Sequence, residues 1–431
     1  MLMTPSPVTD HRLPETGGAN RILGMQKIVS HVYAGGDVTP LWENLMQRVG
    51  ADSSDSAALH DLSTILQTLT RAEEARQVLQ GAVALSRNFC VVHGNGQGPR
   101  LLAFVTPGDF MANTPLDFLL AGSNCVLWLH YVDADTTELV NLPDHDVAFM
   151  AIGESTENAP VLRQMQKVLS DFPGPIMNNH PELISLLTRD GVSTRLSGAP
   201  SLLSPRTYRA KREDLLAVAA GTKRLDDCVP GVAFPLVIRP ISTHAGNGLE
   251  HVADAAGLAA LLRTQPATEL YVAPFIDFRG ADGLYNKQRI VFIRGRAYAS
   301  HMALSEHWIV HYLSAGMADS PAKRAVEQRW METFDTDFAV RHKDSFDALY
   351  NRIGLDYFGI DCAELPDGRL LVFELDVAMV VHNMDSAQVY PYKQVAMRKL
   401  FSAFVAAAEE TAADYHASHH GLMQLSSITG P

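Results

Sequence analysis

The chain has few cysteines, and none of them is spaced for a metal or disulfide framework. There are 4 among 431 residues, at Cys90, Cys125, Cys228 and Cys362, and no two form a CxxC pair. Most of them stand in apolar runs, which is typical of buried free thiols in a reducing compartment. The sequence therefore shows neither a cysteine-based zinc site nor a disulfide scaffold.

The sequence also lacks an excess of positive charge and any long apolar run. Lys and Arg number 35 against 48 Asp and Glu, which gives a formal net charge of −13. Such a balance argues against nucleic acid or an anionic membrane as the main partner. No apolar run is long enough to span a bilayer, and no basic region followed by an apolar one opens the chain. We expect a cytoplasmic protein that binds neither nucleic acid nor membrane.

Two familiar site motifs are missing or incomplete. No GxxxxGK[ST] loop occurs, and in HGNGQGP at 93–99 Pro99 replaces the third glycine of a dinucleotide fingerprint. Strands follow this stretch, which favours a hairpin turn. His307 and His311 have i,i+4 spacing, but there is no HExxH pattern and strand formers lie between them. We therefore expect no zinc site there.

The pattern of apolar residues changes along the chain and predicts several structural units. We expect residues 1–88 to hold a disordered N-terminus followed by helices over 37–88, where apolar residues recur at three-to-four spacing. Short apolar strands alternate with helical patterns over 89–205, which predicts an open, mostly parallel α/β unit. Beyond 205 helix and strand signals mix without strict alternation, which predicts α+β lobes.

YFGIDCAELPDGRLLVFELD at 357–376 combines strand formers, a turn signal and three carboxylates. Its Pro-Asp-Gly predicts a turn between antiparallel strands. Folding about the middle of Asp367-Gly368 places Asp361 opposite Glu374, with Asp376 two residues on, on the same face. Carboxylates among apolar neighbours are costly unless a cation compensates them, and Mg²⁺ or Mn²⁺ prefers such oxygen ligands. The alternative is an edge hairpin whose acids face water.

Two stretches carry candidate phosphate-binding groups. RPISTHAGNGLEHV follows an apolar strand, begins with a cation, and contains glycines that would let backbone N–H groups approach an anion. Its candidate residues are Arg239, His244, Gly246, Asn247 and Gly248. In KQRIVFIRGRAY, Lys287 and Arg289 fall on one strand face by period two. The alternative for the first stretch is an ordinary tight loop. In the second, Arg294 and Arg296 flank the turn glycine and are expected to be solvated.

A candidate substrate position lies in the α/β unit. RLLAFVTPGDFMANTPLDFLLA predicts a strand, a loop and a helix capped by Thr114. A helix N-terminus beyond the carboxyl end of a strand is a common ligand position in open sheets. Gly108, Asn113 and Thr114 are therefore candidate substrate contacts, and the alternative is an ordinary capped turn.

The order of these parts resembles the ATP-grasp superfamily. The resemblance covers roughly 90–412 and is most specific at the acidic hairpin. We expect 413–431, beyond this range, to be a loose tail. The resemblance implies that a pre-ATP-grasp α/β domain over 89–205 precedes two α+β lobes, 206–278 and 279–412, which hold ATP between them. It also implies ATP-dependent carboxylate–amine ligation of small, amino-acid-like substrates through an acyl phosphate, by a protein that is commonly a homodimer.

The resemblance assigns roles to particular residues. The superfamily's Asp and Glu-x-Asn fall on Asp361, Glu374 and Asp376, with Asp in place of the usual Asn, as ligands of Mg²⁺ or Mn²⁺. The strand-end lysine falls on Arg239. An earlier basic nucleotide contact falls on Arg212, with Arg206 as the second candidate.

The strand that would contact the adenine departs from the superfamily pattern. Ala273 replaces a Glu, so adenine recognition would rely on backbone groups around Phe275 and Ile276, with Asp277 or Asp282 for the ribose. We expect four further side chains to line the cavity and to bind phosphate or the substrate carboxylate, namely Lys287, Arg289, His301 and His311.

The departures at Arg239, Ala273 and Asp376 leave two other functions open. One is a nucleotide-binding scaffold without catalysis, in which the N-terminal helical segment docks partners. The other is an ATP-dependent small-molecule kinase on the same lobes. Metal-dependent ADP release would exclude the scaffold, and a trapped acyl phosphate would exclude the kinase.

Overall fold

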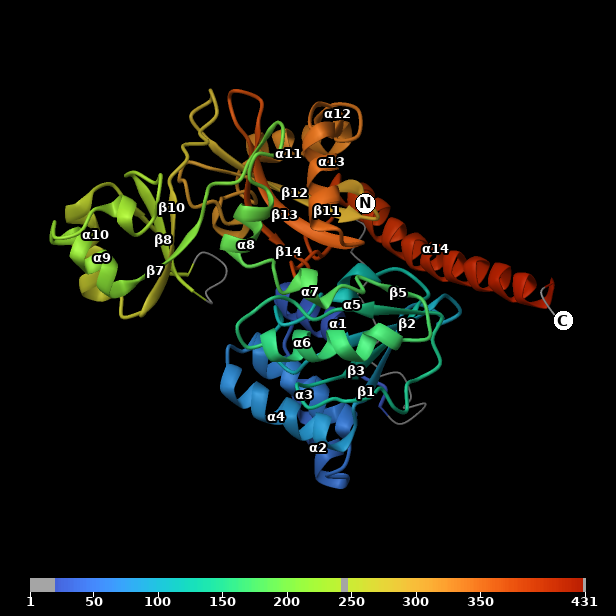
Figure 1. The fold of residues 1–431 in the computed structure, drawn as a ribbon. Coiled ribbons are helices and arrows are strands. Elements are labelled where there is room, and N and C mark those ends of the chain that lie inside the picture. Colours follow the sequence, from blue (N-terminus) through green and yellow to red (C-terminus); the bar gives the residue numbers. More distant parts are fainter. Residues whose placement is uncertain (1–19, 242–246, 429–431) are drawn as a thin grey trace, which may run out of the picture.

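The computed structural model describes residues 20–241 and 247–428, with side chains as far as residue 418. Four helices open the described chain, and the helical prediction for this segment is confirmed. They are α1 (Met25–Tyr33), α2 (Thr39–Ala51), α3 (Ser56–Thr68) and α4 (Ala72–Leu85). In Figure 1 they lie beside the α/β unit.

The α/β unit is built on a five-stranded sheet of order β1-β3-β2-β4-β5. Its strands are β1 (Asn88–Val92), β2 (Arg100–Val105), β3 (Val126–Tyr131), β4 (Val147–Met150) and β5 (Ile176–Met177). All neighbours are parallel except β1 and β3. Its helices are α5 (Leu116–Leu119), α6 (Ala159–Val168), η1 (Leu169–Asp171), α7 (Pro181–Ile184) and α8 (Arg189–Arg195). The predicted open, mostly parallel unit is confirmed.

The hairpin predicted at 93–99 is wrong. β3 lies between β1 and β2 in the sheet, so the loop joins two strands that are not paired. The loop is instead held by Asn124, whose backbone oxygen accepts from the Gly98 N–H at 2.8 Å and whose side chain accepts from the Asn95 N–H at 3.1 Å.

A four-stranded sheet of order β7-β10-β8-β9 forms the unit that we call lobe 1. Its strands are β7 (Tyr208–Lys211), β8 (Leu236–Pro240), β9 (Glu250–Val252) and β10 (Glu269–Pro274). Its helices are α9 (Arg212–Ala219), η2 (Leu225–Asp227) and α10 (Ala255–Thr264). Leu215 of α9 and Leu258 of α10 pack with Ile238 of β8 in the core of this lobe, so both helices cover the same sheet.

A second five-stranded sheet, of order β12-β11-β13-β14-β6, forms lobe 2. Its strands are β6 (Leu202–Leu203), β11 (Tyr285–Ile293), β12 (Arg296–Ser305), β13 (Tyr357–Glu364) and β14 (Leu370–Asp376). Its helices are η3 (Tyr312–Ser314), α11 (Pro321–Thr333), α12 (Phe338–Arg341), α13 (Lys343–Ile353) and α14 (Lys393–Ile428). β6 falls within the range expected for the α/β unit, yet it pairs with β14. An α/β unit with two α+β lobes is the predicted fold class.

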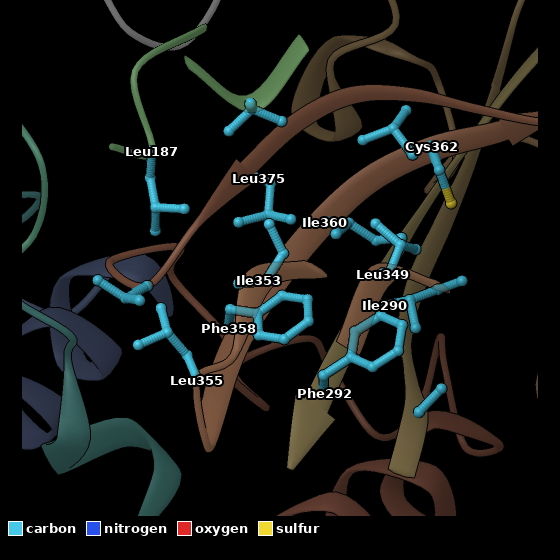
Figure 2. Packing of buried hydrophobic residues seen from close by; sticks show 14 of the residues in the cluster. Leu187, Ile290, Phe292, Leu349, Ile353, Leu355, Phe358, Ile360, Cys362 and Leu375 are labelled. Carbon is cyan, nitrogen blue, oxygen red and sulfur yellow. The ribbon is translucent and has the colours of Figure 1, made fainter. Parts of the chain in front are cut away.

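The core of lobe 2 lies between its sheet and its helices. Phe292 of β11 stacks on Phe358 of β13 with ring centroids 4.6 Å apart, and Leu349 and Ile353 of α13 belong to the same buried cluster (Figure 2). This packing fixes β11 against β13, and with it the polar side chains on the opposite face of both strands.

Residues 413–428 are not the loose tail that we expected. α14 continues to Ile428 and projects from the body of the molecule (Figure 1). Arg294, at the β11–β12 turn, binds Glu410 at 3.2 Å and Asp414 at 2.7 Å, so the helix stays attached beyond residue 412. Within the ranges that the structure describes, no helix has the length and apolar character needed to cross a membrane.

Candidate active site

A cavity of about 450 Å³ opens where the two lobes and the α/β unit meet, and we call it the cleft. β8 and β10 supply its lobe 1 side, and β11, β13 and β14 supply its lobe 2 side. Residues 154–156 of the α/β unit, Arg189 of α8 and residues 308–311, which follow β12, also line it. The cleft therefore draws on both lobes and on the α/β unit.

The acidic hairpin places its carboxylates in the cleft with the predicted pairing. Asp361 lies opposite Glu374, and Gly359 lies opposite Asp376. Near the turn, however, Glu364 faces Leu370, so the turn is centred on one residue, Asp367. A bulge, with Phe373 as the additional residue on β14, then shifts the register by one. Without it Glu374 would lie on the other face of the sheet.

The alternative of an edge hairpin with acids facing water is wrong. β11 and β6 flank β13 and β14 on either side, so neither strand is an edge. Asp361 is only 3% exposed. Its carboxylate therefore needs a positive partner within the protein or the ligand.

That partner is a pair of cations from β11. Lys287 Nζ lies 2.9 Å from Asp361 Oδ2, and Arg289 donates to both carboxylate oxygens, at 2.8 and 3.1 Å. Burial acts to raise the pKa of Asp361, but Arg289 and Lys287 outweigh it and hold the pKa well below its ordinary value. We call Asp361, Lys287 and Arg289 the cleft triad.

The other carboxylate of the opposed pair is held from the α/β unit. Arg189 Nη2 donates to Glu374 Oε1 at 2.6 Å. Burial acts to raise the pKa of Glu374, yet the pKa is lowered because the Arg189 attraction prevails. Arg239 at the end of β8 is 6% exposed, and burial together with the repulsion from Arg189 lowers its pKa to about 10. Cations thus surround the centre of the cleft.

Two further carboxylates in the cleft hold protons more strongly than usual. Burial raises the pKa of Asp376 to about 7, with a contribution from Glu374. Burial and the nearby Asp376 raise the pKa of Glu154, in the loop after β4, to about 7. Lining carboxylates from two different units therefore repel each other.

A metal ion fits part of the predicted ligand set. Both oxygens of Asp361 are taken by Lys287 and Arg289, so Asp361 does not fit as a ligand in this arrangement. Arg189 takes only Oε1 of Glu374, and Asp376 accepts a backbone bond from Ala378 at Oδ1. No three His, Cys, Asp or Glu side chains of the described ranges converge as a metal site. Two carboxylates suit Mg²⁺, which keeps waters and phosphate oxygens as its other ligands.

The end of the cleft beside the link between the lobes is apolar. Val237 of β8 pairs with Ala273 of β10, and both line the cleft together with Phe275. Phe275 lies edge to face with Trp308, with ring centroids 5.6 Å apart. The ring centroid of His251, in β9, is 4.5 Å from that of Phe275 and 5.9 Å from that of Trp308. Trp308 therefore reaches from lobe 2 onto lobe 1.

No protein-family model and no curated protein matches the chain. Solved structures that are similar include the RimK domain ATP-grasp protein from Sphaerobacter thermophilus DSM 20745, 16% identical over 71% of this chain and 98% of that chain, with a TM-score of 0.39. D-alanine–D-alanine ligase from Bacillus anthracis, complexed with ATP, is 14% identical over 74% and 99%, with a TM-score of 0.40. VanG D-Ala:D-Ser ligase from Enterococcus faecalis is 12% identical over 73% and 100%, with a TM-score of 0.42.

The first of these is described as an ATP-grasp protein, the superfamily that the sequence resembles. At such identities and TM-scores these structures establish no activity for this chain. The ligand chemistry of the cleft is therefore inferred from its lining residues.

The structure brings half of the predicted site residues that it describes together in the cleft. Those that line the cleft are Arg239, Ala273, Phe275, Ile276, Lys287, Arg289, His311, Asp361, Glu374 and Asp376. Burial and Lys287 lower the pKa of His311, so the cations of β11 reach this histidine as well. Two predicted residues, His244 and Gly246, lie outside the described ranges.

Other predicted residues, although described, do not line the cleft: Gly108, Asn113, Thr114, Arg206, Arg212, Asn247, Gly248, Asp277, Asp282 and His301. Arg212 turns to the back of lobe 1, where it donates to the backbone oxygens of Leu262 and Gln265. Asp277 is exposed and accepts from the Arg279 N–H. His301 is paired with Arg289 in the sheet, and its ring packs on Tyr312 with centroids 4.8 Å apart.

Thr114 is not the helix cap that we predicted. α5 begins at Leu116, and the Thr114 hydroxyl donates to the Val377 carbonyl at 2.9 Å, just beyond the acidic strand. Asn113 is bonded to both backbone groups of Thr106. This loop thus supports β14, and Met111 is the residue in it that reaches the cleft.

Sequence reasoning missed several lining residues, among them Glu154, Arg189, Arg209 and Tyr271. The Arg209 guanidinium donates to Asp190 and to the Tyr271 hydroxyl, each at 3.1 Å. Arg209 and Tyr271 are opposed in the β7–β10 pair, so strand pairing was a usable signal for them. Glu154 lies in the loop after β4 and Arg189 is the first residue of α8, and no motif marks either of them.

Proposed function

We propose that the chain is an ATP-dependent carboxylate–amine ligase, which forms an amide or peptide bond between small amino-acid-like molecules and releases ADP and phosphate. The observation that carries the proposal is the meeting, in one cleft, of an apolar end, the cations Arg239, Lys287 and Arg289, and the carboxylates Glu374 and Asp376. ATP with a divalent metal offers the matching parts: a base, a polyanion and a cation.

In the proposed complex the base lies at the apolar end of the cleft. Val237, Ala273 and Phe275 would cover it, and the backbone groups near Phe275 and Ile276 would bond its edge. The triphosphate would then run towards Arg239 and the cleft triad, where buried cations are strongest as anion partners because little water screens them.

Glu374 and Asp376 would hold Mg²⁺ or Mn²⁺ together with phosphate oxygens. The ion, when bound, would neutralise charge on the transferring phosphoryl group. Arg189 keeps Glu374 ionised and fixes its position, because the pair is part-buried at 2.6 Å.

The proposed reaction has two displacements. The substrate carboxylate attacks the γ-phosphorus and the bond to the β-phosphate oxygen breaks. ADP is released, and an acyl phosphate is formed. The amine then attacks the acyl carbon, inorganic phosphate leaves with the bonding electron pair, and the nitrogen loses a proton. The residues of the chain position the reactants and stabilise charge, with Lys287 and Arg289 at the phosphoryl group.

One observation favours a scaffold that binds nucleotide without catalysis. Asp361 is already neutralised by Lys287 and Arg289, which leaves fewer carboxylates for metal ions than the superfamily pattern supplies. This scaffold and the ligase differ in one measurable product, since only the ligase forms an acyl phosphate.

The test is ADP and phosphate release by the full chain with ATP and Mg²⁺, screened against pools of amino acids and small carboxylic acids with hydroxylamine present. We expect hydroxamate with one acid, and a loss of at least about tenfold in Glu374→Gln and in Asp376→Ala. Asp367→Asn, at the exposed tip of the same hairpin, is the matched control and should keep full activity. ATP binding without ADP release from any pool would favour the scaffold, and a phosphorylated product without hydroxamate would favour a kinase.

A further inference from the structure

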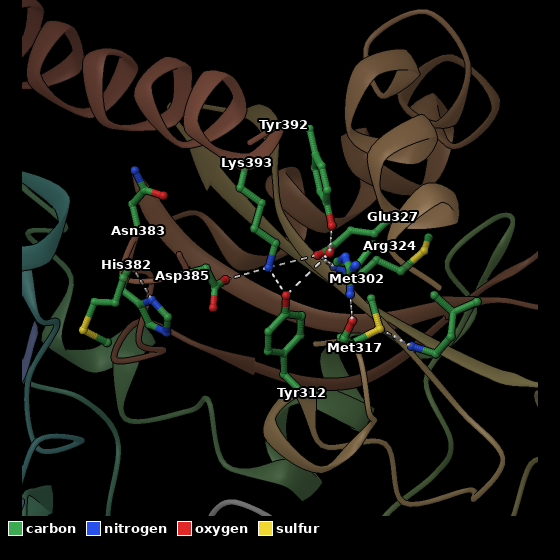
Figure 3. Close-up of polar contacts among 12 residues, drawn as sticks. Met302, Tyr312, Met317, Arg324, Glu327, His382, Asn383, Asp385, Tyr392 and Lys393 are labelled. Carbon is green, nitrogen blue, oxygen red and sulfur yellow. Dashed lines mark hydrogen bonds and ion pairs between the residues drawn. The ribbon is translucent and has the colours of Figure 1, made fainter. Parts of the chain in front are cut away.

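A second group of buried charges lies behind the cleft, at the start of α14. Lys393 is 2% exposed, and its ammonium lies 2.7 Å from Asp385 and 3.2 Å from Glu327 of α11 (Figure 3). The same ammonium binds the Tyr312 hydroxyl and lies over the Tyr312 ring, 4.0 Å from its centroid. We call Lys393, Glu327, Asp385 and Tyr312 the Lys393 cluster.

Every polar member of this cluster is tied to a different element. Glu327 also accepts from the Met302 N–H of β12 at 3.0 Å and from the Tyr392 hydroxyl at 2.6 Å. Asp385 accepts from the Tyr33 hydroxyl of α1 at 3.1 Å. The cluster therefore joins α1, α11, β12 and α14 around one ammonium group. Tyr312 contacts this ammonium with both its ring and its hydroxyl, which restricts the position of its side chain.

Tyr312 follows directly after the segment that lines the cleft. Trp308, Ile309, Val310 and His311 are lining residues, and Trp308 makes the contact with Phe275 of lobe 1. Further along, α11 holds the chain through Lys323, which bonds the Ala315 carbonyl, and Arg324, which bonds the Met317 carbonyl. Tyr312 is thus the tether nearest to the cleft.

We propose that Lys393 is a positioning residue for the cleft: it fixes Tyr312 and thereby holds residues 308–311 in the place where they line the nucleotide end. Apolar residues in place of the whole cluster could fill the same space with equal or better stability. A buried ammonium shared by two carboxylates and a tyrosine instead specifies one position for the segment. The positioning itself is independent of the proposed function, and only its consequence for ATP rests on that function.

The test is hydrogen–deuterium exchange of peptides spanning 306–316 in the full chain without nucleotide. Tyr312→Phe removes the hydroxyl contacts to Lys393 and to Glu327 and keeps the ring. Tyr392→Phe is the matched control, since it removes a hydroxyl from Glu327 but lies outside the cleft segment. We expect exchange over 306–316 to quicken about fivefold in Tyr312→Phe and to stay as in the wild type in Tyr392→Phe. Equal exchange of this segment in both variants would overturn the proposal.

Lys393→Met supplies a second, independent check. If Lys393 acts on the segment through Tyr312, adding Tyr312→Phe to Lys393→Met will not quicken exchange over 306–316 any further, whereas independent effects would multiply. With ATP as substrate, Tyr312→Phe should raise KM for ATP about fivefold with kcat within about twofold. Wild-type protein that releases no ADP would overturn the ligase, and the exchange data would still decide the role of Lys393.

Discussion

The cleft triad and the Lys393 cluster are two buried charge groups with opposite balance. In the cleft triad two cations face one carboxylate, and Lys287 and Arg289 remain 20% and 19% exposed. In the Lys393 cluster one ammonium faces two carboxylates, and the side chains of Lys393, Glu327 and Asp385 are at most 8% exposed. The first group has positive charge left over where a ligand can reach it. The second is sealed, so its charges act only on the protein.

The balance of each group appears in its proton affinities. The excess of cations holds the pKa of Asp361 well below its ordinary value in spite of burial. Burial raises the pKa of Glu327, and the attraction of Lys393 and the hydrogen bonds to the carboxylate do not outweigh it. The pKa of a buried carboxylate therefore depends on the number of cations beside it as well as on their distances.

Breaking the sealed group should cost the most. Lys393→Met leaves Glu327 and Asp385 buried without their cation, and we expect the free energy of unfolding to fall by about 3–5 kcal/mol. Urea denaturation measures this. Lys399→Met, six residues along the same helix, breaks an exposed pair with Asp335 and should cost no more than about 1 kcal/mol. Similar losses in the two variants would mean that burial does not separate these pairs.

Breaking the cleft triad should cost less stability and more activity. In Asp361→Asn the two cations lose their anion, but they are accessible to water, so we expect a loss of about 1–3 kcal/mol in the free energy of unfolding. Because Lys287 and Arg289 would no longer be held in place, ADP release should fall by at least about tenfold. A stability loss equal to that of Lys393→Met would contradict the distinction between an open and a sealed group.

The two groups should respond to pH with opposite signs. The lowered pKa of Asp361 contributes stability that is present above pH 3.8 and is lost as the pH falls further. The raised pKa of Glu327 contributes stability that is present below pH 4.5 and is lost as the pH rises through the folded value. The stability advantage of the wild type over Asp361→Asn should therefore shrink towards low pH. Its advantage over Glu327→Gln should shrink towards high pH, and slopes of equal sign in urea titrations would refute this.

The acidic hairpin shows how far local rules reach. Strand periodicity and turn chemistry correctly predicted that Asp361 faces Glu374. The turn itself is centred half a residue away from the predicted point, and a bulge at Phe373 restores the pairing. Strand propensity cannot predict the position of a bulge, because that position depends on which side chains the two faces of the sheet bury.

Other parts of the site depend on contacts that local rules do not contain. Arg189 reaches Glu374 across 185 positions of the chain, and Thr114 reaches the Val377 carbonyl across 263. Thr114 looked like a helix cap because capping chemistry is local, whereas its hydroxyl serves a strand from another unit. The N-terminal helices and the mostly parallel sheet followed from periodicity, since each repeats its signal over many residues.

The smallest expected effect on stability comes from Lys287→Met. Arg289 keeps both of its bonds to Asp361, so the carboxylate stays neutralised and the free energy of unfolding should change by less than about 1 kcal/mol. KM for ATP should rise severalfold, because the phosphates lose one of their cations. Lys211→Met, on an exposed position of lobe 1, should change neither quantity. If Lys287→Met cost as much stability as Lys393→Met and left KM unchanged, the cleft triad would be structural like the sealed group, and its exposed cations would have no ligand to meet.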